Sequence, residues 1–268
     1  MTAGWRALTE ELDRWASEGR TAFFWWRDDD AVTVTPALER LIGLHRTTGI
    51  PLALAVIPAQ AQPALAERLK SEPQIAALQH GYSHRNHAGP AEKKSEFPAG
   101  RALADRLADM QAGRGLLERL FDARLLSIFV PPWNRLAPDC LPAMPALGYL
   151  AVSAFQARNT YWAAPGLAIL NTHIDPIDWH GDDNDAAVER CLAAACAHLR
   201  AMRAGEQDMQ PLGLLSHHLR HDEIIWSFVA GFLSRTASHP AVRWLDAPAA
   251  MKIGVPGDSA LPTVTPAS

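Results

Sequence analysis

Three clusters of residues that commonly bind metal ions stand out along this chain of 268 residues. They are Asp28-Asp29-Asp30, the stretch His80-Gly-Tyr-Ser-His84-Arg-Asn-His87, and the pair His217-His218, and each follows a short apolar run. One carboxylate and two imidazoles can hold a divalent metal, and a second carboxylate beside them can accept a proton from water. The three clusters therefore predict a metal-dependent hydrolase.

The histidine spacing indicates which side chains would bind the ion. His80 and His84 are four residues apart, so they lie on the same side of a helical turn and both can reach one metal. His87 lies three residues further on, which is also a same-side spacing. It could replace His84 as a ligand, support a ligand from behind, or line the pocket. We expect His80 and His84 to be the ligands.

The elements that must position these residues alternate between short apolar runs and longer helical patterns. The strand-like runs are Ala22–Trp26, Leu52–Ile57, Ile75–Gln79, Leu125–Val130, Leu150–Ser153, Ala168–Thr172, Leu212–Ser216 and Val242–Leu245. The expected helices are Thr35–Thr48, Pro63–Ser71, Arg101–Phe121, Pro138–Leu147, Asp185–Ala204 and Asp222–Ser234. This alternation predicts an α/β protein whose parallel strands close into a (β/α) barrel. The carboxyl ends of such strands open on one face, so the three clusters should converge there.

Composition and termini set the expected organisation. Hydrophobic residues make up 48% of the chain, enough for one large core over residues 1–253. The first twenty residues carry apolar side chains at helical spacing and mixed charges, which predicts an amphipathic helix and no signal peptide. Residues 254–268 are rich in Pro, Ser, Thr and Gly and should form a loosely held tail.

Charge and cysteine usage narrow the partners. The net charge is −4 and the basic residues are scattered, so neither nucleic acid nor an anionic membrane is an expected partner. A small-molecule or oligosaccharide substrate is the better expectation. The three cysteines, Cys140, Cys191 and Cys196, follow no metal-ligand spacing and are expected to be buried thiols of a cytoplasmic protein.

The order of the motifs resembles that of a known enzyme family. Asp-Asp at residues 29–30, His-x-x-x-His at 80–84, Pro-Pro-Trp at 131–133, Asp-x-x-Asp-Trp at 175–179 and Leu-x-His at 215–217 are similar to the five motifs of the polysaccharide deacetylases, carbohydrate esterase family four. These motifs span most of the chain. The resemblance implies a distorted (β/α) barrel of about seven parallel strands.

The resemblance also implies roles for the motif residues. Asp29 would be the general base that deprotonates metal-bound water, and Asp30 would bind zinc or another divalent metal together with His80 and His84. His217 would protonate the departing amine. Asp178 would orient that histidine, as an aspartate orients the histidine of a catalytic triad.

Further residues are expected around this centre. A backbone N–H near Pro132 and Trp133 would stabilise the oxyanion. The residues expected to line the pocket or support these groups are His87, Pro132, Trp133, Asn134, Arg135, Asp175, Trp179, Glu96 and His218. Asp175 is equally well explained as a turn residue before Pro176. Because side chains alternate along a strand, only one of His217 and His218 should point inward, and we favour His217.

One position departs from the family pattern. The third motif of the family begins with an arginine that pairs with the base, whereas this chain has Val130 there. Arg27 or Arg135 could supply the guanidinium from another direction. The expected function is hydrolysis of an N-acyl amide on a sugar or small molecule. The alternatives are a different C–N hydrolase on the same barrel, or a catalytically inactive protein that binds a carbohydrate or another ligand.

Overall fold

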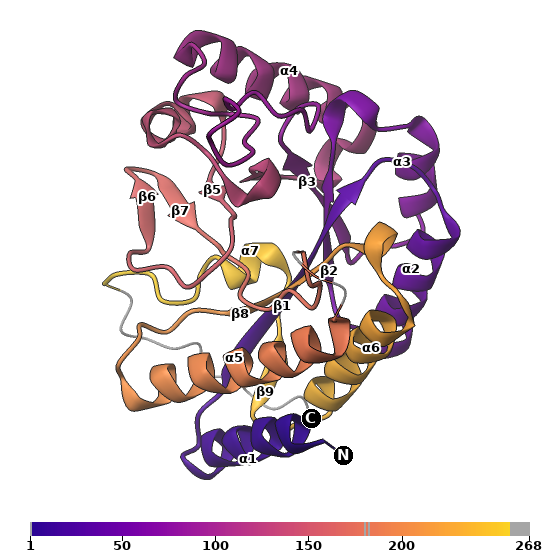
Figure 1. Ribbon diagram of the computed structural model, residues 1–268, viewed down its shortest axis with the longest axis vertical. Coiled ribbons are helices and arrows are strands. Elements are labelled where there is room, and N and C mark those ends of the chain that lie inside the picture. Colours follow the sequence, from indigo (N-terminus) through magenta and orange to yellow (C-terminus); the bar gives the residue numbers. More distant parts are fainter. Residues whose placement is uncertain (1, 180, 182, 258–268) are drawn as a thin grey trace.

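The chain folds as a curled, mostly parallel sheet that forms half a barrel, with helices packed outside it (Figure 1). The computed structural model describes residues 2–179, 181 and 183–257. Its strands are β1 (Ala22–Ala31), β2 (Leu52–Val56), β3 (Ile75–His80), β4 (Leu125–Val130), β5 (Ala151–Val152), β6 (Trp162–Ala164), β7 (Leu167–Ile169), β8 (Leu212–Ser216) and β9 (Val242–Trp244). The predicted distorted (β/α) barrel is confirmed.

The strand order explains how residues distant in sequence meet. Along the sheet the order is β6-β7-β5-β4-β3-β2-β1-β8, and β9 pairs with the first part of β1. All of these pairings are parallel except that between β6 and β7. Beyond β7 the chain crosses towards β8, because Thr172 forms a bridge with Phe155 and Ile174 forms a bridge with Leu214. This crossing segment brings Asp175 to the same end of the barrel as β1 and β8.

Seven α-helices are present in the described part of the chain. They are α1 (Ala3–Ser17), α2 (Pro36–Thr48), α3 (Pro63–Leu69), α4 (Leu103–Phe121), α5 (Asn184–Ala204), α6 (Glu223–Ala237) and the single turn α7 (Ala247–Ala250). The α2 boundaries follow from the sequence: the Thr35 hydroxyl accepts a hydrogen bond from Leu38 N at 3.0 Å, Pro36 opens the helix, and Gly49 ends it with a φ of 69°. None of the helices among the described residues is long and apolar enough to cross a bilayer.

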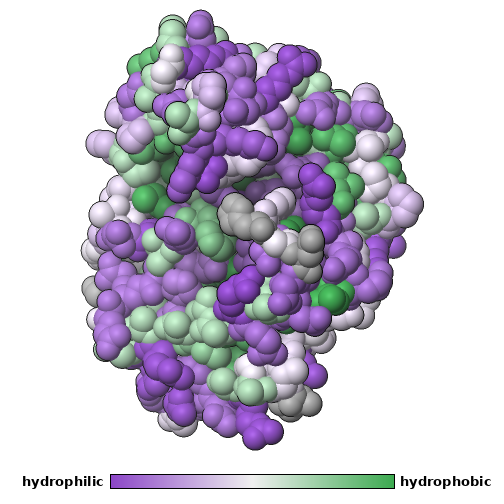
Figure 2. Space-filling view, in the orientation of Figure 1, coloured by the Kyte–Doolittle hydropathy of each residue, from purple (hydrophilic) through white to green (hydrophobic). Residues whose placement is uncertain are grey.

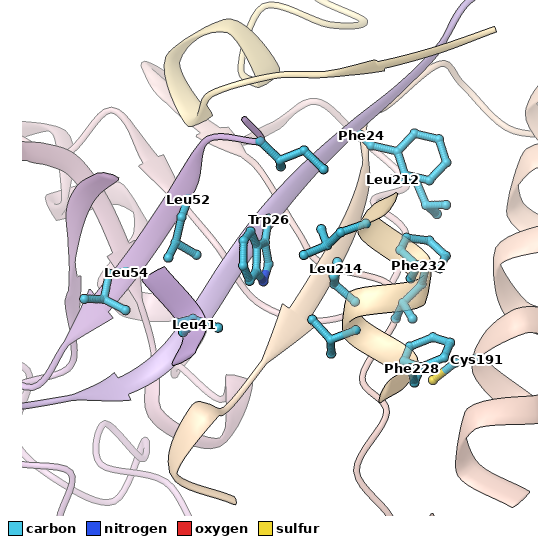
Figure 3. Close-up of a cluster of buried hydrophobic side chains, with 14 of the residues drawn as sticks. Phe24, Trp26, Leu41, Leu52, Leu54, Cys191, Leu212, Leu214, Phe228 and Phe232 are labelled. Atoms are coloured by element: carbon cyan, nitrogen blue, oxygen red, sulfur yellow. The ribbon is translucent and has the colours of Figure 1, made fainter. Parts of the chain in front are cut away.

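The main core lies between the sheet and the helices. Along β1, Phe24 and Trp26 point into this layer, where they meet Leu214 of β8 and Phe232 of α6 (Figure 3). Burying a large apolar side chain of this kind contributes roughly 1.5–3 kcal/mol. Residues of β1 that alternate with them, beginning with Trp25, face the barrel interior instead. The alternation therefore directs Arg27 and Asp29 inward.

The helix predicted over Pro138–Leu147 is wrong: this segment forms two 3₁₀ helices, Pro138–Ala143 and Pro145–Leu147. Pro142 and Pro145 lack the backbone N–H that a continuous α-helix requires, which explains the interruption. Most of the predicted tail, residues 258–268, lies outside the described residues.

Candidate metal centre and active site

Three expected ligands meet at the carboxyl ends of β1 and β3. Asp30, His80 and His84 each present one ligand atom, and these atoms all lie within 4.8 Å of one another. His80 Nε2 is 3.2 Å and His84 Nε2 is 3.4 Å from Asp30 Oδ1. Asp30 Oδ1 is buried without a hydrogen-bond partner among the described residues. A buried carboxylate oxygen facing two imidazole nitrogens is the arrangement that a divalent ion completes.

The backbone around these ligands is locally constrained. Asp30 has a φ of 71° and His84 a φ of 57°, which is the left-handed region that side-chain-bearing residues rarely adopt. His80 Nδ1 lies 3.0 Å from Val130 O, and because a carbonyl only accepts, Nδ1 must donate. The Nε2 lone pair of His80 is thereby directed towards Asp30. Such constraints cost free energy and cluster at functional sites.

The protonation states also suit a cation. Burial alone would raise the pKa of Asp30, yet the adjacent His80 and the nearby His217 and His84 lower it well below its usual range. Burial, reinforced by the charge of His80, lowers the pKa of His84, which favours the neutral imidazole. Burial alone would lower the pKa of His80, yet the charges of Asp29 and Asp30 raise it, so a bound metal ion would replace a proton on this imidazole.

Asp29 is held by Arg27 on the same strand. Arg27 Nε donates to Asp29 Oδ1 at 2.9 Å and its Nη2 donates to Oδ2 at 3.0 Å, and both side chains are buried. The guanidinium also donates to Ser153 Oγ at 2.6 Å, to Ser153 O at 3.0 Å and to Asn134 Oδ1 at 3.1 Å. Arg27 therefore connects the carboxyl ends of β1, β4 and β5.

Arg27 is therefore the arginine that pairs with Asp29. In the family pattern this arginine stands at the position that Val130 occupies here. Val130 is fully buried in the barrel interior, packed among Ala55, Leu78 and other apolar side chains. Arg135 is exposed and donates to Lys94 O at 3.0 Å, away from Asp29. Because Arg27 and Asp29 are two residues apart on one strand, their side chains lie on the same face. Two guanidinium nitrogens of Arg27 can therefore donate to the carboxylate of Asp29.

Asp28, which the sequence analysis left without a role, binds His218. Its carboxylate lies 2.5 Å from His218 Nδ1, accepts from His218 N at 3.0 Å and accepts from Ser216 Oγ at 2.6 Å. Both side chains are buried. A buried, paired carboxylate of this kind ties the end of β8 to β1. The alternation of apolar side chains along β1 could have indicated that Asp28 faces the helix layer, where a carboxylate needs a partner.

The two adjacent histidines contact different groups: His218 binds Asp28, whereas the His217 ring meets Trp179. His217 and His218 are both buried, with exposures of 8% and 2%. The strand ends at Ser216 and a 3₁₀ turn spans His218–Arg220, so the alternation rule no longer applies. His221 accepts a hydrogen bond from His217 N at 3.1 Å, and burial lowers the pKa of His221 to about 4.

His217 faces Asp175 and Trp179. The Trp179 ring meets the His217 ring edge-on with centroids 4.8 Å apart, and Trp179 Nε1 donates to Asp175 Oδ2 at 2.7 Å. Asp175 Oδ1 accepts from Ile177 N at 3.1 Å. Burial raises the pKa of Asp175, and the nearby charge of His217 opposes that rise. A cavity of about 570 Å³ borders Asp175 on its other side, between the residues after β5 and helix α5.

Asp178 contacts helix α5. Its Oδ2 is 3.5 Å from Arg190 Nη2 on α5, and its backbone N–H donates to Asn184 Oδ1 at 3.0 Å. The structure brings Asp175 towards His217 and places Asp178 next to Arg190 and Asn184 of α5. The sequence spacing of the two aspartates could not separate them, because the chain turns at Pro176 between them.

Glu96 supports the histidine loop. Its carboxylate is fully buried and accepts from Tyr82 N at 3.1 Å, Ser83 N at 2.6 Å and Ser83 Oγ at 2.9 Å. These contacts fix the turn between His80 and His84. His87, by contrast, is exposed, and its backbone N–H donates to Ser95 O at 2.9 Å.

The Pro132–Asn134 turn lies next to His84. Trp133 and Asn134 both have a φ of 56°, and the Trp133 ring lies 4.4 Å from that of His84. Asn134 N and Arg135 N donate to Pro131 O and Pro132 O, at 2.9 and 3.2 Å. Trp133 N donates to no acceptor within the described ranges. It is thus the backbone donor in this turn that remains for a ligand.

Comparisons with known proteins show which solved structures this architecture resembles. No family model matches the chain, and no curated protein matches it either. A solved Mycobacterium smegmatis protein, named as a polysaccharide deacetylase, is 16% identical with a TM-score of 0.62, over 87% of this chain and 90% of that chain. Puue allantoinase is 14% identical with a TM-score of 0.57, over 87% and 89% of the two chains.

A third solved structure is a mutant of a pseudoenzyme of carbohydrate esterase family four with restored enzymatic activity. It is 11% identical with a TM-score of 0.56, over 87% of this chain and 68% of that chain. At these identities the likeness concerns backbone architecture. The chain has the fold of the polysaccharide deacetylases.

Proposed function

We propose that this protein is a divalent-metal-dependent hydrolase that cleaves an N-acyl amide on a sugar or other small molecule. The observation that carries the proposal is the meeting of Asp30, His80 and His84 within 4.8 Å, directly beside the Asp29–Arg27 pair. A cation bound there would lie next to a fixed carboxylate. Such a combination serves hydrolysis by activated water.

Asp30, His80 and His84 would hold the metal. When bound there, zinc or another divalent ion lowers the pKa of a water molecule and polarises an acyl carbonyl. The residues fit such an ion, because the carboxylate is ionised, Nε2 of His80 is oriented by Val130 O, and Asp30 Oδ1 has no other hydrogen-bond partner within the described residues.

Asp29 would accept the proton of the attacking water. Arg27 donates a hydrogen bond to each of its oxygens, which fixes the direction of the carboxylate. Each carboxylate oxygen has a second lone pair, so the hydrogen bonds from Arg27 leave Asp29 able to accept a proton. The backbone N–H of Trp133 would donate to the oxygen that becomes negatively charged during attack.

His217 would donate a proton to the departing amine. It lies at the carboxyl end of β8, and Asp175 and Trp179 face it. Asp175 therefore takes the orienting role that the sequence had given to Asp178. The Trp179 ring, which donates a hydrogen bond to Asp175, limits how His217 can turn. The cavity beside Asp175 gives room for part of a substrate.

Arg27 bears on the alternative of an inactive binding protein. That alternative depended on a base without a guanidinium, because Val130 replaces the expected arginine. Arg27 supplies two hydrogen bonds to Asp29, which supports a catalytic protein over an inactive one.

The test compares zinc-loaded wild type with Asp29→Asn for release of acyl groups from a panel of N-acetylated sugars, small amides and cyclic amides. Loss of the base should lower kcat by about 10²–10⁴-fold. Metal content should be unchanged, because Asp29 is not among the three ligands. Turnover by Asp29→Asn at the wild-type rate would show that the base is wrongly assigned.

A further inference from the structure

Four basic residues lie on segments that adjoin the candidate metal centre. Arg85 directly follows the candidate ligand His84, and Arg135 follows Trp133 by two residues. Lys93 and Lys94 lie in the segment that leads back from the histidine loop to α4, and all four of these side chains are exposed. We call Arg85, Lys93, Lys94 and Arg135 the basic rim.

Hydrogen bonds hold the segments of the basic rim side by side. Arg135 Nη1 donates to Lys94 O at 3.0 Å, and Ser95 Oγ donates to Arg135 O at 3.2 Å. His87 N donates to Ser95 O at 2.9 Å, which joins the stretch after His84 to the lysine segment. Figure 2 shows hydrophilic residues over much of the upper part of the face seen in Figure 1, where the chain between β3 and α4 lies. The rim is thus an ordered surface beside the site.

The positive charges of the basic rim are not neutralised by carboxylates of the described residues. None of its four members forms an ion pair with a carboxylate of the described residues, whereas Arg40, Arg68 and most other arginines do. The two acidic residues of the same segment bind backbone groups instead. Glu92 accepts from Gly89 N at 2.8 Å, and Glu96 accepts from the Tyr82 and Ser83 amides. A cluster of unpaired cations is notable in a chain whose net charge is −4.

We propose that the basic rim binds an anionic group of the substrate, a phosphate or a carboxylate, on the same molecule that carries the scissile amide. This rests on the proposed function, which places the reacting amide at Asp29 and Asp30. Because the cations are exposed, they attract the anion mainly through a field that salt screens within about 8 Å at physiological ionic strength. They therefore raise the affinity and the association rate of anionic substrates selectively.

The chain has four lysines, two in the basic rim and two outside it, so the same charge reversal can be made at either pair. Lys93→Glu with Lys94→Glu alters the rim. Lys70→Glu with Lys252→Glu changes the net charge equally, at the end of α3 and after α7, outside the rim segments. Both double variants are made in zinc-loaded protein, with and without Asp29→Asn, so that binding is measured apart from turnover.

The probes are N-acetylglucosamine 1-phosphate, N-acetylmuramic acid and neutral N-acetylglucosamine. We expect the rim variant to weaken binding of an anionic probe by about tenfold at low salt, with less effect at high salt, and to leave the neutral probe within about twofold. The Lys70/Lys252 variant should bind all three as wild type does. Comparing the phosphate with the carboxylate identifies the anion, and any anion binding to the metal itself is common to both variants.

Equal effects of the two double variants, or equal effects on charged and neutral probes, would overturn the inference. If the protein hydrolyses neutral and anionic amides alike without dependence on Lys93 and Lys94, the proposed function stands and the inference fails. If no amide is hydrolysed but anionic probes bind through the rim, the inference stands and the proposed function fails.

Discussion

The replacement Arg27→Met tests whether Arg27 offsets the free-energy cost of burying the Asp29 carboxylate in the folded protein. The side chain is fully buried and donates both to Asp29 and to groups at the ends of β4 and β5. Methionine has similar length but no charge, so Asp29 would remain as an unpaired buried carboxylate. Removing one partner of a buried ion pair typically costs about 3–5 kcal/mol of unfolding free energy.

Urea or thermal unfolding of metal-free protein measures this cost without a contribution from metal binding. For a chain of this size, the loss corresponds to a fall in Tm on the order of 10 °C. Arg46→Met is the matched control, because Arg46 is 57% exposed and its partner Glu72 keeps an ion pair with Arg68. That control should cost no more than about 1 kcal/mol.

A double variant separates charge from packing. When Asp29→Asn is added to Arg27→Met, no unpaired charge remains, so much of the stability should return. Equal costs for Arg27→Met and Arg46→Met would refute the reasoning, as would an undiminished cost in the double variant. Either result would mean that Asp29 finds another partner or water when Arg27 is absent.

Two further predictions concern Glu96 and Glu72. Glu96→Ala removes the carboxylate that fixes the turn before His84, so zinc affinity, measured by competition with a chelator, should fall about 10–100-fold, while Glu92→Ala leaves it unchanged. Burial alone would raise the pKa of Glu72, yet Arg46 and Arg68 lower it to about 2. Glu72→Gln should therefore be less stable than wild type at pH 7, and the difference should shrink as the pH falls from about 4.5 towards 2. A difference that is constant over that range would contradict the ion-pair account.

Much of the fold follows from sequence pattern. The alternation of apolar runs and helical segments predicts the strands and their parallel order, because each unit must return across the sheet. It also predicts that Asp30, His80 and His217 approach one another, since all three follow strands. The ten-residue strand β1 extends five residues beyond its predicted end at Trp26, so all three aspartates belong to the strand itself.

Other features depend on geometry that no local pattern records. Arg27 pairs with Asp29 because they share one face of β1, but only the observed extension of the strand establishes that face. Asp175 faces His217 because the chain at Ile174 forms a bridge to β8 and turns Asp175 towards that histidine. The sequence pattern does not record this course, so it could not decide between Asp175 and Asp178. The Asp28–His218 pair joins two strand ends that are 190 residues apart in sequence, so spacing alone could not reveal it.

Zinc content tests the central claim most directly. Purified protein is incubated with zinc, dialysed and submitted to elemental analysis as wild type, as His80→Ala with His84→Ala, and as His87→Ala. We expect about one zinc per chain in wild type and in His87→Ala, since His87 is exposed and outside the ligand set, and none in the double variant. Equal zinc in all three proteins would contradict a centre built from Asp30, His80 and His84, and so would its absence from all three.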